Sequence, residues 1–229
     1  MRSSSTNLIL AMVFALGTAM GCSAEINKPD ASGKTQREST KRTSQESYES
    51  AASKYVHLHD FVSEEQKLLS DESWDVPETR IEIYPLDGGG MDNYLSGANA
   101  DNSYYFETMR KTELQGDLRA ILDEIAQRWS KSGWRVREFT SSYSGNARVT
   151  AITDEGYWIA ADESDNRLYL TAHTPPYWGE YLPLADDIHE RYEAEKARGE
   201  HARYDIGEDE HLSLMPGDYR PFPSWEAVP

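Results

Sequence analysis

The chain has 229 residues and a formal net charge of −17, with 23 basic residues against 40 acidic ones. This balance argues against binding to nucleic acid, which needs a basic face, and against charge-driven docking on anionic lipid headgroups. The single cysteine, Cys22, excludes an intrachain disulfide.

The N-terminal segment has the features of an export signal. Arg2 is the only charged residue before position 25, and an apolar run of secretory length extends from Leu8 to Met20. This run is short for a membrane-spanning helix and ends directly before Gly21 and Cys22. We therefore expect residues 1–21 to be a signal peptide.

The end of this apolar run, Thr18-Ala19-Met20-Gly21-Cys22, resembles the lipobox of bacterial lipoproteins. That motif has small residues before an obligatory cysteine; Gly21 fits it, whereas Ala19 stands where leucine is commoner. The resemblance implies a diacylglycerol on the Cys22 thiol and cleavage before Cys22. Acyl chains there would anchor the exported chain to the outer face of the cell membrane, since each buried methylene contributes about 0.8 kcal/mol. The alternative is an ordinary signal peptide with a chance cysteine.

The segment after the cysteine has the composition of a linker. Residues 22–45 are rich in Ser, Thr, Lys and Glu and have almost no apolar side chains. Such a segment cannot bury enough apolar surface to offset its conformational entropy. We therefore expect residues 22–45 to be a lipidated cysteine and a disordered tether, residues 46–185 to be an α+β domain, and residues 186–229 to be an exposed helix and an acidic, proline-rich tail.

Two amphipathic helices are predicted within the domain. The first extends from about Gln45 to Leu69, where apolar residues recur on one helical stripe. The second opens near Thr112 and ends at Gly133, which supplies a left-handed C-cap. Its apolar residues keep one face of a helix: Leu114, Leu118, Ile121, Leu122, Ile125 and Trp129.

Strand character recurs in six segments, namely Arg80–Leu86, Tyr104–Lys111, Trp134–Phe139, Arg148–Ile152, Tyr157–Ala161 and Arg167–His173. Turn residues separate the last four, and the final turn, Asp162–Asn166, holds several carboxylates. It lacks the central glycine and distal glutamate of a calcium loop, so we interpret it as a solvated acidic turn. The fold predicted is α+β: an antiparallel sheet of about five to six strands packed against an N-terminal helix and a central helix, with an extended C-terminal segment.

Beyond the sheet, a third helix is predicted from Asp186 to Arg198. Its apolar stripe is thin, so we expect it to lie exposed. The tail after Gly207 is expected to be extended, with Tyr219, Phe222 and Trp225 as the residues that could pack.

Alternation along the strands assigns two faces to the sheet. One face carries the apolar residues Val149, Ala151, Tyr157, Ile159, Ala161, Leu168, Leu170 and Ala172, and the central helix should cover it. The opposite face shows aromatic and polar side chains. Its candidate contact residues for a partner are Trp158, Tyr169 and His173, together with Tyr177 and Trp178 just after the strands. Either the first helix and the C-terminal segment cover this face, or it is exposed and binds something.

The run from the central helix to Pro175 resembles small lipoproteins of actinobacteria such as Streptomyces. The resemblance is carried by Gly133-Trp134-Arg135-Val136, Asp154-Glu155-Gly156-Tyr157, Leu168-Tyr169-Leu170-Thr171 and Thr174-Pro175. It implies an extracytoplasmic location and a fold, and no activity. Many such proteins have a cysteine after the closing proline, where this chain has Pro176.

The sequence favours a binding module of the cell envelope over an enzyme. It contains no Gly-x-Ser-x-Gly elbow and no His-Glu-x-x-His motif. His57 and His59 are two apart on a predicted helix and point to different faces, so we expect no metal site and no cofactor there. The expected partners are the membrane, through acyl chains on Cys22, and an envelope protein or a small ligand, with no nucleic acid. An extracytoplasmic hydrolase, a carrier of a small apolar ligand and an assembly accessory remain the alternatives.

Overall fold

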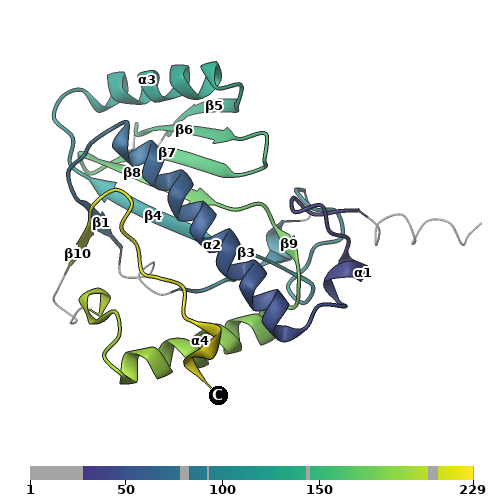
Figure 1. Ribbon diagram of the computed structural model, residues 1–229. Helices are drawn as coiled ribbons and strands as arrows, with labels where there is room; N and C mark the ends of the chain where they lie inside the picture. The colour runs from purple at the N-terminus through teal and green to yellow at the C-terminus, as the bar shows by residue number, and fades with distance from the viewer. Residues whose placement is uncertain (1–27, 78–82, 92, 143–144, 206–210, 229) are drawn as a thin grey trace, which may run out of the picture.

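The computed structural model describes residues 28–77, 83–91, 93–142, 145–205 and 211–228. They form a seven-stranded antiparallel sheet and a three-stranded antiparallel sheet, with helices against them (Figure 1). The predicted α+β fold is confirmed. The predicted signal peptide and Cys22 lie outside the described residues. In the described part of the chain, no helix is both long and apolar enough to span a membrane.

The larger sheet has the strand order β10-β1-β4-β8-β7-β6-β5. Its strands are β1 Trp74–Val76, β4 Glu107–Thr112, β5 Arg135–Thr140, β6 Ala147–Ile152, β7 Trp158–Ser164, β8 Arg167–His173 and β10 Leu212–Leu214. The smaller sheet consists of β2 Leu86–Asp87, β3 Ser103–Tyr105 and β9 Tyr177–Trp178. The helices are α1 Gln36–Ser39, α2 Ser44–Lys67, α3 Leu118–Lys131 and α4 Tyr181–Ala197, with 3-10 turns η2 Gly88–Gly90, η3 Ala202–Tyr204 and η4 Trp225–Ala227.

The predicted strands after the central helix are confirmed, and the sheet is wider than expected because β1 and β10 add to one edge. The predicted acidic loop Asp162–Asn166 is shorter than expected. Asp162 still pairs with Tyr169, so that only Asp165 and Asn166 form the turn, both with positive φ (50° and 59°). Asp and Asn tolerate that conformation better than most residues, which allows a tight hairpin. The predicted strand Arg80–Leu86 lies outside the described residues as far as residue 82, and in its described part it is wrong for Ile83, Tyr84 and Pro85, since only Leu86 belongs to a strand, β2.

The first predicted helix is confirmed as α2, which Thr43 and Glu46 begin with a capping box. The central helix, α3, starts later than predicted. Thr112 pairs with Leu168 as the last residue of β4, and the helix begins at Leu118 after an Asp117 cap. Its end is confirmed, since Gly133 follows it with φ +84°.

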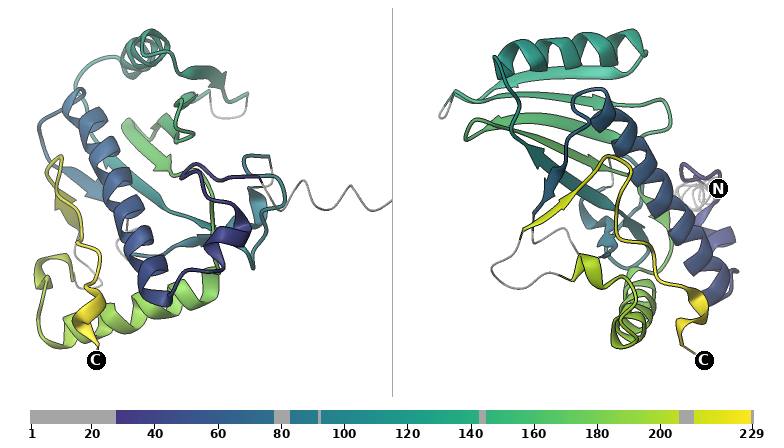
Figure 2. Two further views of the ribbon diagram at one scale, coloured as in Figure 1. Left: turned by 45° about the vertical axis from the view of Figure 1, so that its right-hand side comes forward. Right: turned by 60° about the vertical axis from the view of Figure 1, so that its left-hand side comes forward.

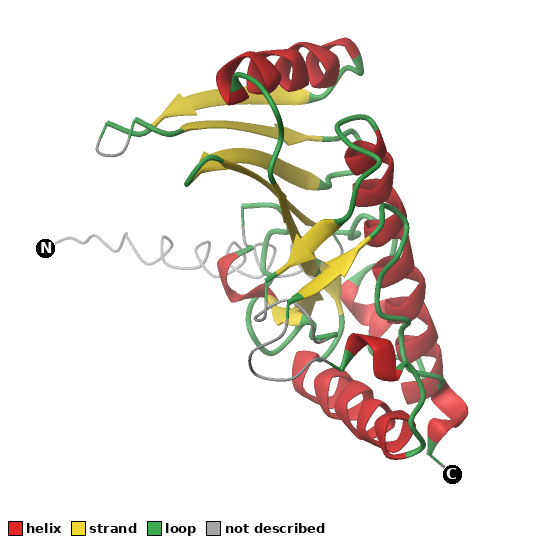
Figure 3. Cartoon of the chain, turned by 90° about the vertical axis from the view of Figure 1, so that its left-hand side faces the viewer, coloured by secondary structure: helices red, strands yellow, loops and turns green. Residues whose placement is uncertain are grey.

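The helices α2 and α3 lie on one face of the large sheet (Figure 3). α3 packs over β5, β6 and β7, whereas α2 crosses β4 and β8. The residues predicted to face inward are buried: Val149, Ala151, Tyr157, Ile159, Ala161, Leu168, Leu170 and Ala172. This core extends beyond the predicted domain, which ended at residue 185, because Ile188 of α4 belongs to it.

The predicted disordered tether is wrong for residues 28–45, which pack on the domain. Buried Asp30 accepts a hydrogen bond from the Trp178 main-chain N–H (3.1 Å), and the Trp178 indole donates to the Lys28 carbonyl (2.9 Å). The contacts are hydrogen bonds rather than apolar burial, so composition did not reveal them. Residues 22–27 lie outside the described residues.

The predicted exposed C-terminal helix is also wrong. α4 begins at Tyr181 and buries Leu184, Ala185, Ile188, Arg191 and Glu195. The segment after it is extended, as expected, and returns across α2 in Figure 2. Tyr219, Phe222 and Trp225 pack against the main core, so the boundary predicted at residue 185 divides one structural unit.

Candidate functional site

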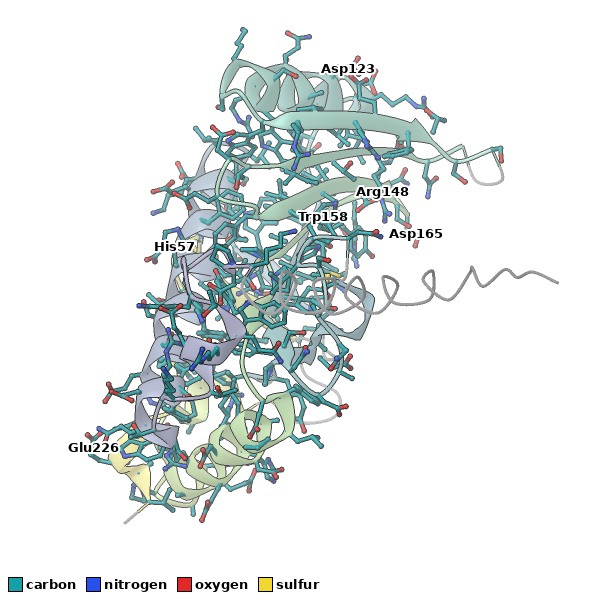
Figure 4. All side chains as sticks on the ribbon, turned by 90° about the vertical axis from the view of Figure 1, so that its right-hand side faces the viewer. His57, Asp123, Arg148, Trp158, Asp165 and Glu226 are labelled. Carbon is teal, nitrogen blue, oxygen red and sulfur yellow. The ribbon has the colours of Figure 1, made fainter. Side chains whose placement is uncertain are left out.

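The candidate site is the face of the large sheet opposite α2 and α3. Within the described residues, no helix covers this face over β5–β8 (Figure 3). Figure 4 views the molecule from the right-hand side of Figure 1, with Arg148 and Trp158 labelled on neighbouring strands and Asp123 on α3. Of the two alternatives for this face, cover by the first helix is therefore wrong, because α2 lies on the other face.

Strand register arranges the side chains of this face in three rows that run across the strands. The first row is Arg135, Ile152, Trp158 and His173. The middle row is Arg137, Thr150, Ala160, Thr171 and Met109. The third row is Phe139, Arg148, Asp162, Tyr169 and Lys111.

The side chains of the middle row rise less above the sheet than those of the outer rows, because its residues on β6, β7 and β8 are small. Thr150, Ala160 and Thr171 stand between rows of larger side chains, and this difference in height hollows the face. The result is an open groove of about 1300 Å³, here called the sheet groove. Its lining includes the floor residues Thr150, Thr171 and Met109, the first-row residues Ile152 and Trp158, and the third-row residues Phe139, Arg148 and Tyr169.

Three of the predicted contact residues, Trp158, Tyr169 and His173, lie on this face, and all are half-buried. Trp158 stacks on His173, with ring centroids 4.9 Å apart and an interplanar angle of 12°. Tyr94 lies edge-on to His173 at 6.0 Å, which makes one end of the face aromatic. Burial lowers the pKa of His173, so its ring is a neutral part of this cluster.

The other two predicted contact residues do not belong to the site. Tyr177 and Trp178 form β9 in the small sheet and are only 4% and 1% exposed. The chain leaves the large sheet at Thr174, so the strand alternation does not continue to them. Their role is structural, since Trp178 holds the N-terminal segment and Tyr177 lies under the Lys54 ammonium at 3.9 Å.

A role in the site was not predicted from the sequence for the arginines of the sheet groove. Arg135, Arg137 and Arg148 line it, against Asp162 and Glu163. Arg148 forms an ion pair with Asp162, whereas the exposed guanidinium groups of Arg135 and Arg137 make no ion pair with the described residues. The sequence does contain a pattern that indicates this arrangement. Arg135 and Arg137 flank the inward-facing Val136, so both project from the opposite face of β5.

Asp162 is an acidic residue in the lining of the sheet groove. Burial raises the pKa of its carboxyl group, and the Arg148 guanidinium acts in the opposite direction. This carboxylate is therefore already partnered. The groove as a whole carries more cationic than anionic side chains in a chain of net charge −17.

A second group of polar residues lies at the end of α4. Donor atoms of Glu195, Glu200 and His201 lie within 4.8 Å of one another, which is close enough to hold a metal ion. Both carboxylates have other partners, since Glu195 accepts the Ser224 N–H (2.7 Å) and Glu200 accepts from Arg198 (2.6 Å). We therefore regard this cluster as an anchor for the C-terminal segment. His57 and His59 do point apart as predicted, His57 exposed and His59 buried.

Lys54 is a buried cation without a carboxylate partner within hydrogen-bond distance in the described residues. It is 8% exposed, and its ammonium group donates to the Tyr104 hydroxyl (3.0 Å). Burial lowers the pKa of this ammonium group from 10.5 to about 7. A lysine with such a pKa could act as a nucleophile, but Lys54 is enclosed by Tyr104 and Tyr177 and is not among the groove residues.

Raising the pH from about 7.5 to about 9.5 is expected to increase the free energy of unfolding by about 2–3 kcal/mol through Lys54. In this range the unfolded chain keeps the proton on Lys54, whereas the folded chain, with a pKa of about 7, has lost it. The unfolded state thus binds more protons, and stability rises with pH. Urea unfolding at several pH values measures the slope. Lys54→Met, which keeps the apolar stem, should flatten it; an unchanged slope in that variant would contradict the assignment.

Comparison with known proteins gives no relative from which a function could be transferred. No protein-family description matches the chain, and neither a curated protein nor a solved structure matches it. The function is therefore argued from the sheet groove itself.

Proposed function

We propose that this chain is an exported lipoprotein, anchored through Cys22 to the outer face of the cell membrane, whose sheet groove is a non-catalytic binding site for a component of the cell envelope. The observation that carries the proposal is the uncovered, hollowed face of the large sheet. Soluble proteins seldom leave a wide face with several aromatic and apolar side chains open unless it binds something.

The shape of the sheet groove favours binding over catalysis. Enzymes and carriers of small ligands usually have an enclosed pocket with converging polar groups. The sheet groove is instead a broad open surface. Its half-buried acid, Asp162, forms an ion pair with Arg148. The groove is therefore better suited to contact a partner over several strands than to activate a substrate.

The anchor would hold this groove close to the membrane. Only residues 23–27 separate the proposed lipid site, Cys22, from the first described residue, Lys28. Even a fully extended segment of this length spans about 20 Å, since each residue adds at most about 3.6 Å. The partner would thus be found within a short distance of the membrane surface.

Photo-crosslinking in bacterial cells tests the proposal on the full chain. Phe139, which lines the sheet groove and is 51% exposed, is replaced by a photoreactive phenylalanine analogue. Irradiation is expected to give a discrete crosslinked product in the membrane fraction. In a Cys22→Ser background the chain should lose its acyl label and leave that fraction.

The matched control places the same analogue at Tyr84, an aromatic residue of similar exposure (48%) that is not among the groove residues. This position should give no discrete product. Equal products at both positions, or none at Phe139, would contradict a binding role for the groove. Retention of Cys22→Ser with the membrane would contradict the lipid anchor.

A further inference from the structure

We infer that the ligand of the sheet groove is an extended acidic peptide: a segment of an exported protein that carries an aromatic side chain next to carboxylates. This inference rests on the proposed function and names the partner for the same site. Four features of the groove support it: two arginines without an ion-pair partner among the described residues, the spacing between charge and apolar surface, the length of the groove, and the position of β5 at the edge of the sheet.

The first feature is charge. Arg135 and Arg137 project from the same face of β5, two residues apart, which places them about 7 Å from each other along the strand. Neither guanidinium has an ion-pair partner in the described residues, although the chain has 40 acidic residues. Guanidinium groups bind carboxylates through two parallel hydrogen bonds, so an incoming ligand with carboxylates would complete the pairs.

The second feature is the spacing between charge and apolar surface. Arg135, Ile152 and Trp158 are consecutive in the first row, so Arg135 and Trp158 are two strand spacings, or about 10 Å, apart. If an aromatic ring of the peptide lay over Ile152, it would contact Trp158 on one side. Acidic side chains next to it in the peptide would then lie beside Arg135. This spacing matches an aromatic residue followed by acidic residues in an extended chain.

The third feature is length. The sheet groove crosses β5, β6, β7 and β8, so it covers three inter-strand distances, about 15 Å. An extended peptide rises about 3.3 Å per residue, so about five residues fill it. The hydroxyl groups of Thr150 and Thr171 on the floor can bond to the main chain of such a peptide.

The fourth feature distinguishes a peptide from an anionic polysaccharide. β5 is the edge of the large sheet and has β6 as its one strand neighbour among the described residues. An edge strand offers main-chain N–H and C=O groups, and a peptide that leaves the groove at β5 can pair with them. A polysaccharide has no main-chain amide groups at the spacing of a β-strand, so it cannot pair with this edge as a peptide does.

A selection from a random dodecapeptide library displayed on ribosomes tests the inference with the full chain as bait. The recovered peptides are expected to be enriched in Asp and Glu within a few residues of Phe, Tyr or Trp. The best of them, made synthetically and labelled, should lose about tenfold in affinity for an Arg135→Gln/Arg137→Gln variant, with anisotropy as the readout. Raised salt should weaken binding to the unaltered chain.

The matched control is Lys67→Gln/Lys131→Gln, which removes the same charge from exposed positions on α2 and α3. It should bind the selected peptide as the unaltered chain does. Peptides without acidic enrichment, an equal loss in both double variants, or tighter binding of an oligogalacturonate than of any selected peptide would overturn the inference. If these occur while Phe139 still crosslinks in cells, only the ligand class is wrong; if Phe139 also fails to crosslink, the proposed function fails with it.

Discussion

Trp129→Ala is expected to lower the free energy of unfolding by about 3–5 kcal/mol, as large-to-small changes of a buried tryptophan do. The indole is 1% exposed and belongs to the core under α2 and α3. Its Nε1 donates a hydrogen bond to a carboxylate oxygen of Glu65 at 2.8 Å. The substitution would therefore leave a cavity and remove a donor from a carboxylate that is itself only 7% exposed.

Guanidinium unfolding followed by far-UV circular dichroism measures this loss. Trp129→Phe separates the two causes, because it keeps most of the volume but has no donor for Glu65; a loss of about 1–3 kcal/mol is expected. Leu182→Ala is the control, since Leu182 is 63% exposed and should change stability by less than about 0.5 kcal/mol. A loss below about 1 kcal/mol for Trp129→Ala would show that the helices do not depend on this contact.

Hydrophobic periodicity predicted the part of the fold that this core contains. The alternation in β6, β7 and β8 and the apolar stripes of the two predicted helices indicate which side chains are removed from water. The predicted inward-facing strand residues are buried, and so are Leu118, Leu122, Ile125 and Trp129 of α3, whereas Ile121 and Leu114, which precedes α3, are only partly buried. Gly133 predicted the end of α3 because its positive φ is open to few other residues. The start of α3 was misplaced, since the main-chain pairing of Thr112 with Leu168 leaves no mark in the pattern of apolar residues.

The N-terminal segment was missed for a different reason. Residues 28–45 are attached to the domain by two hydrogen bonds from Trp178, one to the carboxylate of Asp30 and one to the carbonyl of Lys28. A polar segment that is held by a few hydrogen bonds has the same composition as a disordered one. Only the position of Trp178 in space distinguishes them.

The candidate site was predicted in part. Alternation placed Trp158, Tyr169 and His173 on one face, but it could not show whether that face was covered, because coverage depends on where α2 crosses the sheet. Arg135 and Arg137 were not recognised, since charged residues at alternate positions of a strand are typical of any solvated face. These arginines become part of the candidate site only through the strand register, which places Arg135 opposite Ile152 and Arg137 opposite Thr150 of β6.

A chain that ends at Asp218 is expected to lose more than about 5 kcal/mol of unfolding free energy. It would lack the partly buried Tyr219, Phe222 and Trp225, which pack against the main core, and the buried Arg220. Complete burial of one large apolar side chain contributes about 1.5–3 kcal/mol. Because domains of this kind are stable by about 5–15 kcal/mol, such a chain should be largely unfolded or expose apolar surface. Thermal melting and limited proteolysis measure the effect.

This loss of stability is expected because the C-terminal segment forms hydrogen bonds with buried polar groups of α2 and α4. The hydroxyls of Tyr48 and Tyr55 donate to the carbonyls of Pro223 and Arg220, each at 3.0 Å. On α4, the Arg191 guanidinium donates to the Trp225 carbonyl at 3.1 Å and lies 3.7 Å from the centre of its ring. Truncation would remove these hydrogen bonds and ring contacts and expose the groups to water.

Two further chains make the test specific. Trp225→Ala in the full chain should cost about 2–3 kcal/mol, less than the truncation, because the remaining contacts persist. Met215→Ala, at a residue that is 54% exposed just before the segment, should cost less than about 0.5 kcal/mol. A synthetic peptide of residues 219–229 added to the truncated chain should restore protection from protease. If the truncated chain instead melts at the same temperature as the full chain, the C-terminal segment is an appendage and α4 is stabilised by its own apolar residues.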